Sequence, residues 1–385
     1  MTEPAEKFPA NQLARTSTQT QALAVRSAAL VSRGLRDLAR DSNWLIKKVF
    51  AGSSSQLVVS PAGEVCALSP LVRHGTERIA LYDVERGVPT LALVVPGEPD
   101  VCPVGLSAAF AWSPTARHLV AAWGGWLPEL HMFDLHGKVF LGGFGDFKSF
   151  PANLTWSDSG KYFAAASRGR GEAELRLWPA DQAASATMPF AADAAAELRA
   201  PSSAENWLAP GTDETESANE SGFGGFGRLA FNPAETILAV VAEIDGDWAD
   251  DSIVLLEVPG FGRRTVIRAQ GRITDLAWTP DNRQLIYCSG GQAYRVSAQT
   301  RKSEPLPFGA ELCAVHPHLP MALCFSSLLK NSAKGRLFLA DLNRLAVYDE
   351  YAAEGVVNIR WSLDGSRAYA VTTDGLAYIY EPPVL

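Results

Sequence analysis

The chain has 385 residues, of which 47% are apolar and 20% charged, and its net charge is −8. This composition excludes wholesale disorder, and the acidic balance makes nucleic acid an unexpected partner. The sequence contains no apolar run of 18 residues and no hydrophobic signal segment near its N-terminus, so we expect neither a transmembrane helix nor secretion.

Residues 1–42 are predicted to form an N-terminal arm with a basic amphipathic helix from about Thr18 to Arg40. At helical spacing, one face carries Leu23, Leu30, Val31, Leu35 and Leu38, and the opposite face carries Arg26, Arg33 and Arg40. The favoured interpretation is that the helix docks on protein, either the body of the chain or a partner. Leu30 and Leu38 supply the apolar contact, and Arg26 and Arg33 are further tentative binding residues. An anionic membrane surface, a mitochondrial-type presequence and a solvated arm stay open as alternatives.

A short motif recurs seven times along the rest of the chain. It runs apolar–any–apolar, then a turn residue, and usually ends in Pro or Asp. The copies are LVVSP, FAWSP, LTWSD, LAFNP, LAWTP, CAVHP and IRWSL, with the turn residues Ser60, Ser113, Ser157, Asn232, Thr279, His316 and Ser362. Their spacings are 37 to 53 residues except for one of 75. A period of about 40–45 residues is typical of four-stranded propeller blades.

The fourth repeat illustrates the strand pattern inside one unit. After LAFNP come an apolar run at Thr236–Ile244, a polar turn at Gly246–Asp251, and two further strand-like segments at Ser252–Val258 and Arg264–Arg268. Short β-branched segments separated by Gly, Asp and Pro predict antiparallel strands. Each repeat is therefore predicted to contain four strands.

The repeats resemble those of divergent WD40-like β-propellers, with a W-S-P-D-G-like turn. The closing Trp-Asp pair of that family is echoed at Tyr82-Asp83, Phe133-Asp134 and Trp178-Pro179. The resemblance implies an all-β, seven-bladed propeller over residues 43–385. The seventh unit stops after three strands, so we expect Asn43–Phe50 to supply its fourth strand and to close the ring.

The 75-residue spacing predicts a surface insertion at about residues 182–227. Its composition of Ala, Ser, Glu and Asp cannot form a core of its own. It is either an insertion without function or a partner-binding loop that uses Trp207, Phe223 and Phe226. If Met188–Ala191 is the outer strand of the third unit, most of this insertion opens on the face described next.

Connections between the second and third strands are long in five units, and they share one face of a propeller. They are Pro70–Glu77, Trp123–Glu129, Arg168–Glu172, Asp245–Asp251 and Ser326–Gly335. Aromatic and Arg side chains commonly anchor protein interfaces. The tentative partner-binding residues on this loop-rich face are Arg73, Trp126, Arg168, Arg170 and Trp248. The alternative is that the connections lengthened without selection for binding.

No catalytic, cofactor-binding or metal-binding constellation is evident in the sequence. His316 and His318 flank a proline, but a third ligand is lacking nearby, and His316 occupies the turn position of its repeat. The five cysteines, in runs such as Leu285–Ser289, are interpreted as small buried hydrophobes of a reducing compartment. We therefore expect a cytoplasmic, non-enzymatic scaffold that binds protein and uses no cofactor. The alternatives are a peripheral membrane adaptor and a propeller enzyme with a metal site in its channel.

Overall fold

The computed structural model describes residues 44–49, 57–69, 78–84, 86–93, 108–123, 129–167, 173–180, 196–199, 223–244, 251–262, 264–327 and 333–382. Every regular element within these ranges is a β-strand. These residues include no helix with the length and apolar character needed to cross a membrane. The predicted helix of the N-terminal arm lies outside the described residues.

The strands form seven four-stranded antiparallel sheets, each built mainly from one repeat. The first and second sheets are β2 (Leu57–Val59), β3 (Glu64–Ser69), β4 (Arg78–Asp83), β5 (Val88–Leu93); and β6 (Ala108–Trp112), β7 (His118–Trp123), β8 (Leu130–Asp134), β9 (Val139–Phe144). The third and fourth are β10 (Asn153–Trp156), β11 (Tyr162–Ala166), β12 (Glu174–Pro179), β13 (Ala196–Arg199); and β14 (Phe223–Phe231), β15 (Ile237–Ile244), β16 (Ser252–Glu257), β17 (Arg264–Arg268).

The remaining sheets follow the same order of strands, with one exception at the end. The fifth and sixth are β18 (Ile273–Trp278), β19 (Gln284–Ser289), β20 (Gln292–Ser297), β21 (Ser303–Pro305); and β22 (Leu312–Val315), β23 (Met321–Ser327), β24 (Lys334–Asp341), β25 (Ala346–Glu354). The seventh sheet is β26 (Val356–Trp361), β27 (Ala368–Thr372), β28 (Leu376–Tyr380), with β1 (Trp44–Lys48) as its outer strand.

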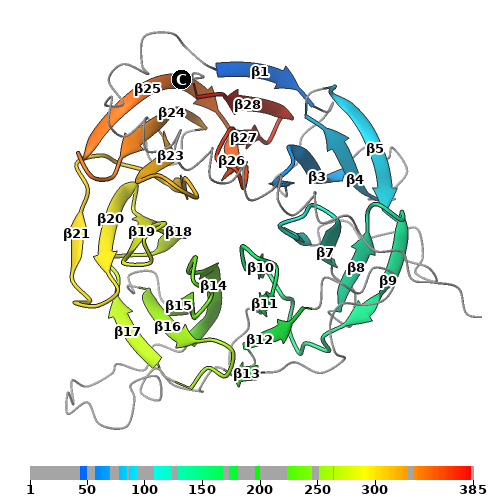
Figure 1. The fold of residues 1–385 in the computed structure, drawn as a ribbon, viewed down its shortest axis with the longest axis horizontal. Coiled ribbons are helices and arrows are strands. Elements are labelled where there is room, and N and C mark those ends of the chain that lie inside the picture. The colour runs from blue at the N-terminus through cyan, green and yellow to red at the C-terminus, as the bar shows by residue number, and fades with distance from the viewer. Residues whose placement is uncertain are drawn as a thin grey trace, which may run out of the picture.

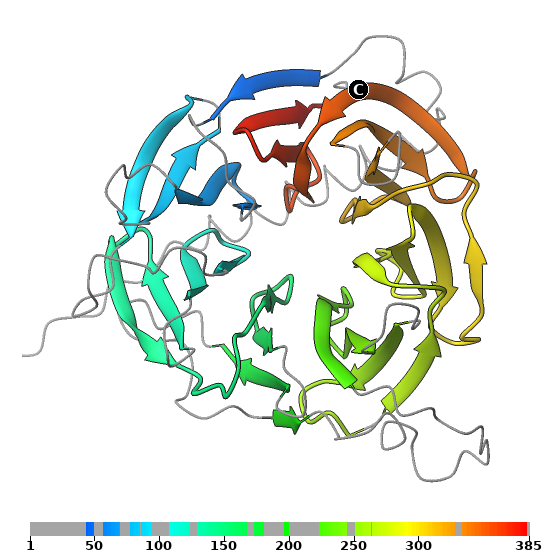
Figure 2. The same ribbon diagram turned by 180° about the vertical axis from the view of Figure 1, so that it is seen from behind.

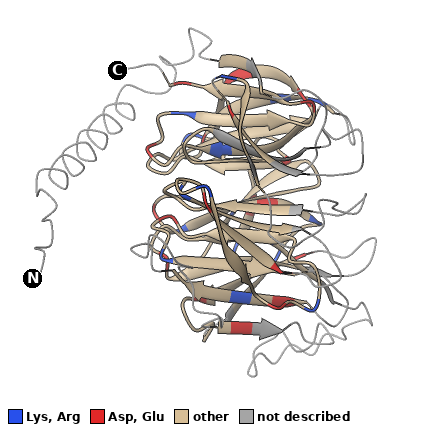
Figure 3. Ribbon diagram, turned by 90° about the vertical axis from the view of Figure 1, so that its right-hand side faces the viewer, with Lys and Arg blue, Asp and Glu red and all other residues tan. Residues whose placement is uncertain are grey.

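The sheets stand around a common axis and make a closed β-propeller (Figures 1 and 2). The first strand of each repeat is innermost, and it contacts the inner strands of both neighbouring sheets in the cyclic order β2, β6, β10, β14, β18, β22, β26 and back to β2. Seen from the side, the ring carries basic and acidic residues interspersed on its strands and turns (Figure 3). The predicted all-β propeller fold is confirmed.

The hydrophobic core is divided among the junctions between neighbouring sheets. Among the described residues, buried apolar side chains form seven clusters, and each cluster joins two adjacent sheets. The second strands are covered on both faces, as in β11, whose five residues YFAAA are all buried. This explains their continuous apolar runs, because a strand covered on both sides has no polar face.

Aspartates at the ends of third strands hold the turns that follow them. The carboxylate of Asp83 accepts a hydrogen bond from the backbone N–H of Arg86, and that of Asp134 accepts from His136 and Gly137. Arg117 donates to the other oxygen of Asp134 at 2.8 Å, and this bond holds the pKa of Asp134 down to about 2. The Tyr82-Asp83 and Phe133-Asp134 pairs of the repeats thus have a structural role.

The predicted surface insertion overlaps two strands of the propeller. Ala196–Arg199 forms β13, the outer strand of the third sheet, so the outer strand is not Met188–Ala191. The Gly-rich segment that ends the predicted insertion belongs to β14, where Phe226 is fully buried. Glycine gives this strand an irregular register, with shifts between Phe223 and Gly225 and between Phe226 and Leu229, which disguised the strand in the sequence.

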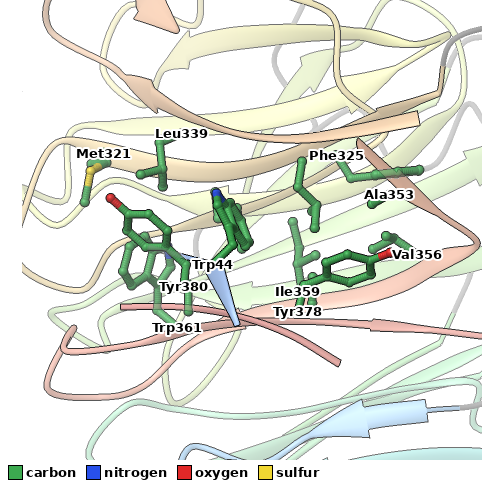
Figure 4. Packing of buried hydrophobic residues seen from close by; sticks show 14 of the residues in the cluster. Trp44, Met321, Phe325, Leu339, Ala353, Val356, Ile359, Trp361, Tyr378 and Tyr380 are labelled. Atoms are coloured by element: carbon green, nitrogen blue, oxygen red, sulfur yellow. The ribbon is translucent and has the colours of Figure 1, made fainter. Parts of the chain in front are cut away.

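The N-terminal strand completes the seventh sheet, as predicted. β1 pairs antiparallel with β28 over five residues, from Trp44 opposite Tyr380 to Lys48 opposite Leu376. The side chain of Trp44 is buried between the sixth and seventh sheets, close to Tyr380 (Figure 4). Its ring centroid lies 5.1 Å from that of Tyr380 and 6.0 Å from that of Tyr351. Trp44 therefore joins the start of the chain to two sheets at once.

Substitution of Trp44 by Ala is expected to lower the free energy of unfolding by about 3–5 kcal/mol, because it removes a large aromatic side chain from a packed junction. Leu45→Ala is the matched control, since Leu45 lies on the same strand and is 47% exposed. Urea denaturation followed by tryptophan fluorescence measures both. Equal stability of the two variants would contradict the role given to β1.

Candidate functional site: the central channel

The turn residue of each repeat fixes the path from the inner strand into the second strand. A side-chain acceptor at this position bonds the backbone N–H where the second strand begins. The bonds are Ser113 to His118 at 2.9 Å, Ser157 to Tyr162 at 3.0 Å, Asn232 to Ile237 at 2.8 Å, Thr279 to Gln284 at 3.1 Å and Ser362 to Arg367 at 3.0 Å. The side-chain acceptor of the motif is therefore used in a hydrogen bond that stabilises the turn, and it is not available for catalysis or ligand binding.

His316 occupies the same turn position with an imidazole ring, but its side chain bonds N–H groups inside the turn, before the second strand begins at Met321. Its Nδ1 atom accepts from the backbone N–H groups of His318 and Leu319 at 3.0 Å, and its Nε2 lies 3.1 Å from the carbonyl oxygen of Gly365. A ring that accepts at Nδ1 carries its proton on Nε2, so the neutral form fits this site. Burial lowers the pKa of His316 to about 4. The prediction that His316 is a turn residue is confirmed.

His316→Asn is expected to weaken the acid sensitivity of the fold. In the unfolded chain His316 takes up a proton near 6.5, but in the folded chain only near pH 4, so the folded state loses stability as pH falls through that window. The loss attributable to this ring is about 3 kcal/mol. Asn keeps a side-chain acceptor at the turn position, as Asn232 does in the fourth repeat, but it does not titrate.

Urea denaturation at pH 7 and near pH 4 tests this prediction. His316→Asn is expected to be less stable than the native chain at pH 7, because the bond to Gly365 is lost, and the difference is expected to shrink toward pH 4. Leu45→Ala, which removes no ionisable group, is the control and is expected to keep the native pH dependence. An undiminished acid loss in His316→Asn would refute the assignment.

Three tryptophans of the motif tie their inner strand to the preceding one. Trp112 donates its indole N–H to the carbonyl of Val58 at 3.2 Å, and Trp278 donates to Ala230 at 3.0 Å. Trp361 donates to Ala314 at 2.9 Å. In each case the acceptor lies two residues before the turn residue of the neighbouring repeat, so one geometry is repeated around the ring.

In four repeats a polar residue four positions before the turn residue ties its inner strand to the next one. Asn153 donates to the carbonyl of Phe226 at 3.1 Å, and Arg228 donates to that of Thr274 at 3.2 Å. The remaining two accept: Asp275 from the backbone N–H of Cys313 at 2.9 Å, and Asn358 from that of Val59 at 3.3 Å. Burial raises the pKa of Asp275, while Arg228, 3.8 Å away, opposes the shift.

The inner strands enclose a cavity of about 330 Å³ on the propeller axis. Its wall includes the residues two positions before the turn residue, here called the channel positions. Six of the seven channel positions line the cavity: Val58, Thr155, Ala230, Ala277, Ala314 and Arg360. At the mouth the wall is formed by turns, with Pro233, Pro280 and Pro317 on one side and Asp158 on another. This cavity is a candidate binding site built by described residues.

Arg360 is the single charged residue at the channel positions, and the sequence analysis did not select it. Burial lowers the pKa of its guanidinium, and Asp158 acts on it in the opposite direction. The signal was present in the sequence, since IRWSL places Arg where the other copies of the motif have Val, Ala or Thr. It was missed because strand periodicity alone does not say which residues face the axis.

The predicted partner-binding residues are not brought together by the described part of the structure. Arg73, Trp126, Arg168, Arg170 and Trp248 lie in connections outside the described residues, and so do Leu30, Leu38, Arg26 and Arg33 of the arm. No group of three or more His, Cys, Asp or Glu able to hold a metal occurs within the ranges that the structure describes.

Three of the cysteines belong to the core. Cys288, Cys313 and Cys324 are buried and free at the junction of the fifth and sixth sheets. A hydrogen bond with Cys313, together with burial, raises the pKa of the Cys288 thiol, and burial raises that of Cys324. Thiols in this state are weak nucleophiles, in agreement with their interpretation as small hydrophobes.

Neither protein families nor curated proteins yield a match to this sequence. Among solved structures, the fold is similar to a chain in the crystal structure of the mitotic checkpoint complex, with a TM-score of 0.58 and 12% sequence identity. The similarity covers 90% of this chain and 95% of the other. At this level of identity the comparison supports the fold.

Proposed function

We propose that this chain is a seven-bladed, WD40-like propeller that acts as a non-enzymatic scaffold in the cytoplasm. It binds partner proteins through its loop-rich face and its N-terminal arm. The observation that carries the proposal is the closed ring itself, in which the polar residues of the inner strands bond neighbouring strands. Such a ring is a rigid support for connections on both of its faces.

The direction of the strands supports a shared face for the predicted binding residues. All inner strands run the same way along the axis, so the connections from second to third strands leave every sheet on the same side. Arg73 lies between β3 and β4, Trp126 between β7 and β8, and Trp248 between β15 and β16. In the sequence, Arg168 and Arg170 fall between β11 and β12. Aromatic and Arg side chains are the residue types that most often dominate binding energy.

The solved structure with a similar fold is part of a complex, which is the setting expected of a scaffold. The arm precedes β1, whose place in the seventh sheet ties the arm to the edge of the ring. We propose that its Leu30 and Leu38 face packs on protein, with Arg26 and Arg33 adding charge complementarity.

Substitution of both Trp126 and Trp248 by Ala is expected to reduce partner binding at least tenfold without lowering the unfolding temperature. Immobilised native chain first captures partners from a native cell extract, and binding of each captured protein is then measured with purified components. A matched control replaces exposed outer-strand residues, Val139 and Arg268, by Ala. Unchanged affinity of the Trp variant for every captured partner would refute the loop-rich face as the binding surface.

The arm is tested separately by Leu30→Asp with Leu38→Asp. Loss of partner binding, with an unchanged unfolding temperature, is the expected result. Sedimentation with vesicles that contain anionic lipid distinguishes protein docking from binding of the arm to a membrane surface. Vesicle binding that needs both leucines and both Arg26 and Arg33 would replace protein docking by a membrane-anchored adaptor.

A further inference from the structure

A charged side chain at a channel position differs from polar side chains elsewhere on the inner strands, because it forms no hydrogen bond with a neighbouring strand. Polar side chains four positions before the turn residue bond the next inner strand, as Arg228 does with the carbonyl of Thr274. Arg360, at a channel position, makes no hydrogen bond and no ion pair with any residue that the structure describes. The same position is Val, Ala or Thr in the other six repeats, so the propeller does not need a charge there.

A partly buried guanidinium without a partner costs stability, because the charge loses water and gains no counterion. The charge that acts on Arg360 is that of Asp158, which follows β10 and lines the same cavity. The two carboxylate oxygens and the guanidinium are farther apart than an ion pair allows, since no bridge within 4.0 Å joins them. Space therefore remains between them inside the cavity.

The other carboxylates near the channel are engaged elsewhere. Asp275 accepts from the backbone N–H groups of Cys313 and Leu276 and lies beside Arg228. Glu235 accepts from the backbone and the hydroxyl of Ser159 at the outer rim. Arg360 is thus left as the cation that faces the cavity with its donors unused by the described residues.

We propose that the central channel binds one organic carboxylate on a short aliphatic stem, held by Arg360. A guanidinium presents paired donors that match a carboxylate, and the surrounding alanines leave room for it. Pro233, Pro280, Pro317 and Ala277 offer apolar contact to the stem. A volume of about 330 Å³ is at the lower end of the range of ligand sites, which suits a small acid or one acidic side chain.

This site is independent of the proposed loop-rich face. The cavity mouth at Pro233, Pro280 and Pro317 is formed by the turns between first and second strands, on the opposite side of the ring. The same chemistry could come from a free small acid or from a glutamate side chain of a bound polypeptide. Butyrate and glutamate capped at both ends, with capped glutamine as the neutral analogue, are the probes that separate these sources.

Calorimetric titration of the full chain is expected to show saturable binding of at least one of the two carboxylates, with capped glutamine at least tenfold weaker than capped glutamate. Arg360→Gln is expected to weaken binding at least tenfold. Asp158→Asn is expected to strengthen it, because a negative charge across the cavity is removed. Arg268→Gln, on the outer strand β17, is the charge-matched control and is expected to bind as the native chain does.

Tighter binding of butyrate identifies a free acid as the natural ligand, and tighter binding of capped glutamate identifies an acidic side chain. Failure of both carboxylates to saturate the native chain, or equal binding by Arg360→Gln, would overturn the proposal. Measurements of unfolding temperature give a second test that needs no ligand. Arg360→Gln is expected to unfold at a higher temperature than the native chain, because an unpaired charge has been removed. A lower unfolding temperature would show that Arg360 is structural, and the proposal would fail.

Discussion

Closure of the ring depends on hydrogen bonds between neighbouring inner strands. Indole N–H groups of Trp112, Trp278 and Trp361 reach back to the preceding strand. Side chains four residues before the turn reach forward to the next one, as Asn153 does to Phe226. Because these bonds lie where the sheets come closest to the axis, they set the angle between sheets, and the apolar clusters fill the wedge that widens outward.

Each position of this arrangement requires a hydrogen-bond donor or acceptor, and more than one amino acid can supply it. Serine, threonine and asparagine each place an acceptor within reach of the start of the second strand, and histidine at the same position accepts from N–H groups inside the turn. Valine or phenylalanine can replace the tryptophan where the apolar cluster suffices, as at Val59 and Phe231. A fold specified in this way tolerates wide sequence change, in keeping with 12% identity at a TM-score of 0.58.

Much of the propeller could be predicted from the sequence because its signals are local and repeated. The motif located all seven inner strands, and β17 was predicted with the bounds observed, Arg264–Arg268. The third and fourth sheets show where local signals end. β13 is four residues long with no apolar run, and β14 begins in a Gly-rich segment whose bulges break the period of two. Their place is decided by pairing with β12 and β15, which no short window contains.

The candidate site was harder to predict than the fold. The proposed binding site depends on a residue that differs in type from the residues at the same position of the other repeats, and that position faces the axis. Arg360 belongs to an otherwise regular motif, and the sequence pattern of an amphipathic strand predicts that an arginine is exposed to solvent. Only the arrangement of the seven sheets shows that this residue lines the cavity. The closing pair of strands was predictable for the opposite reason, since an incomplete seventh repeat leaves an unpaired edge that must be covered.

The pairing of β1 with β28 also has a consequence for biosynthesis. On a ribosome β1 is made before every other described strand, and its partner is made after all of them. Trp44 and the exposed pair Leu45 and Ile46 therefore spend the whole of translation without their final neighbours. Until β28 has been made, Trp44–Lys48 has no strand to pair with, and an unpaired strand edge with apolar side chains promotes aggregation during folding.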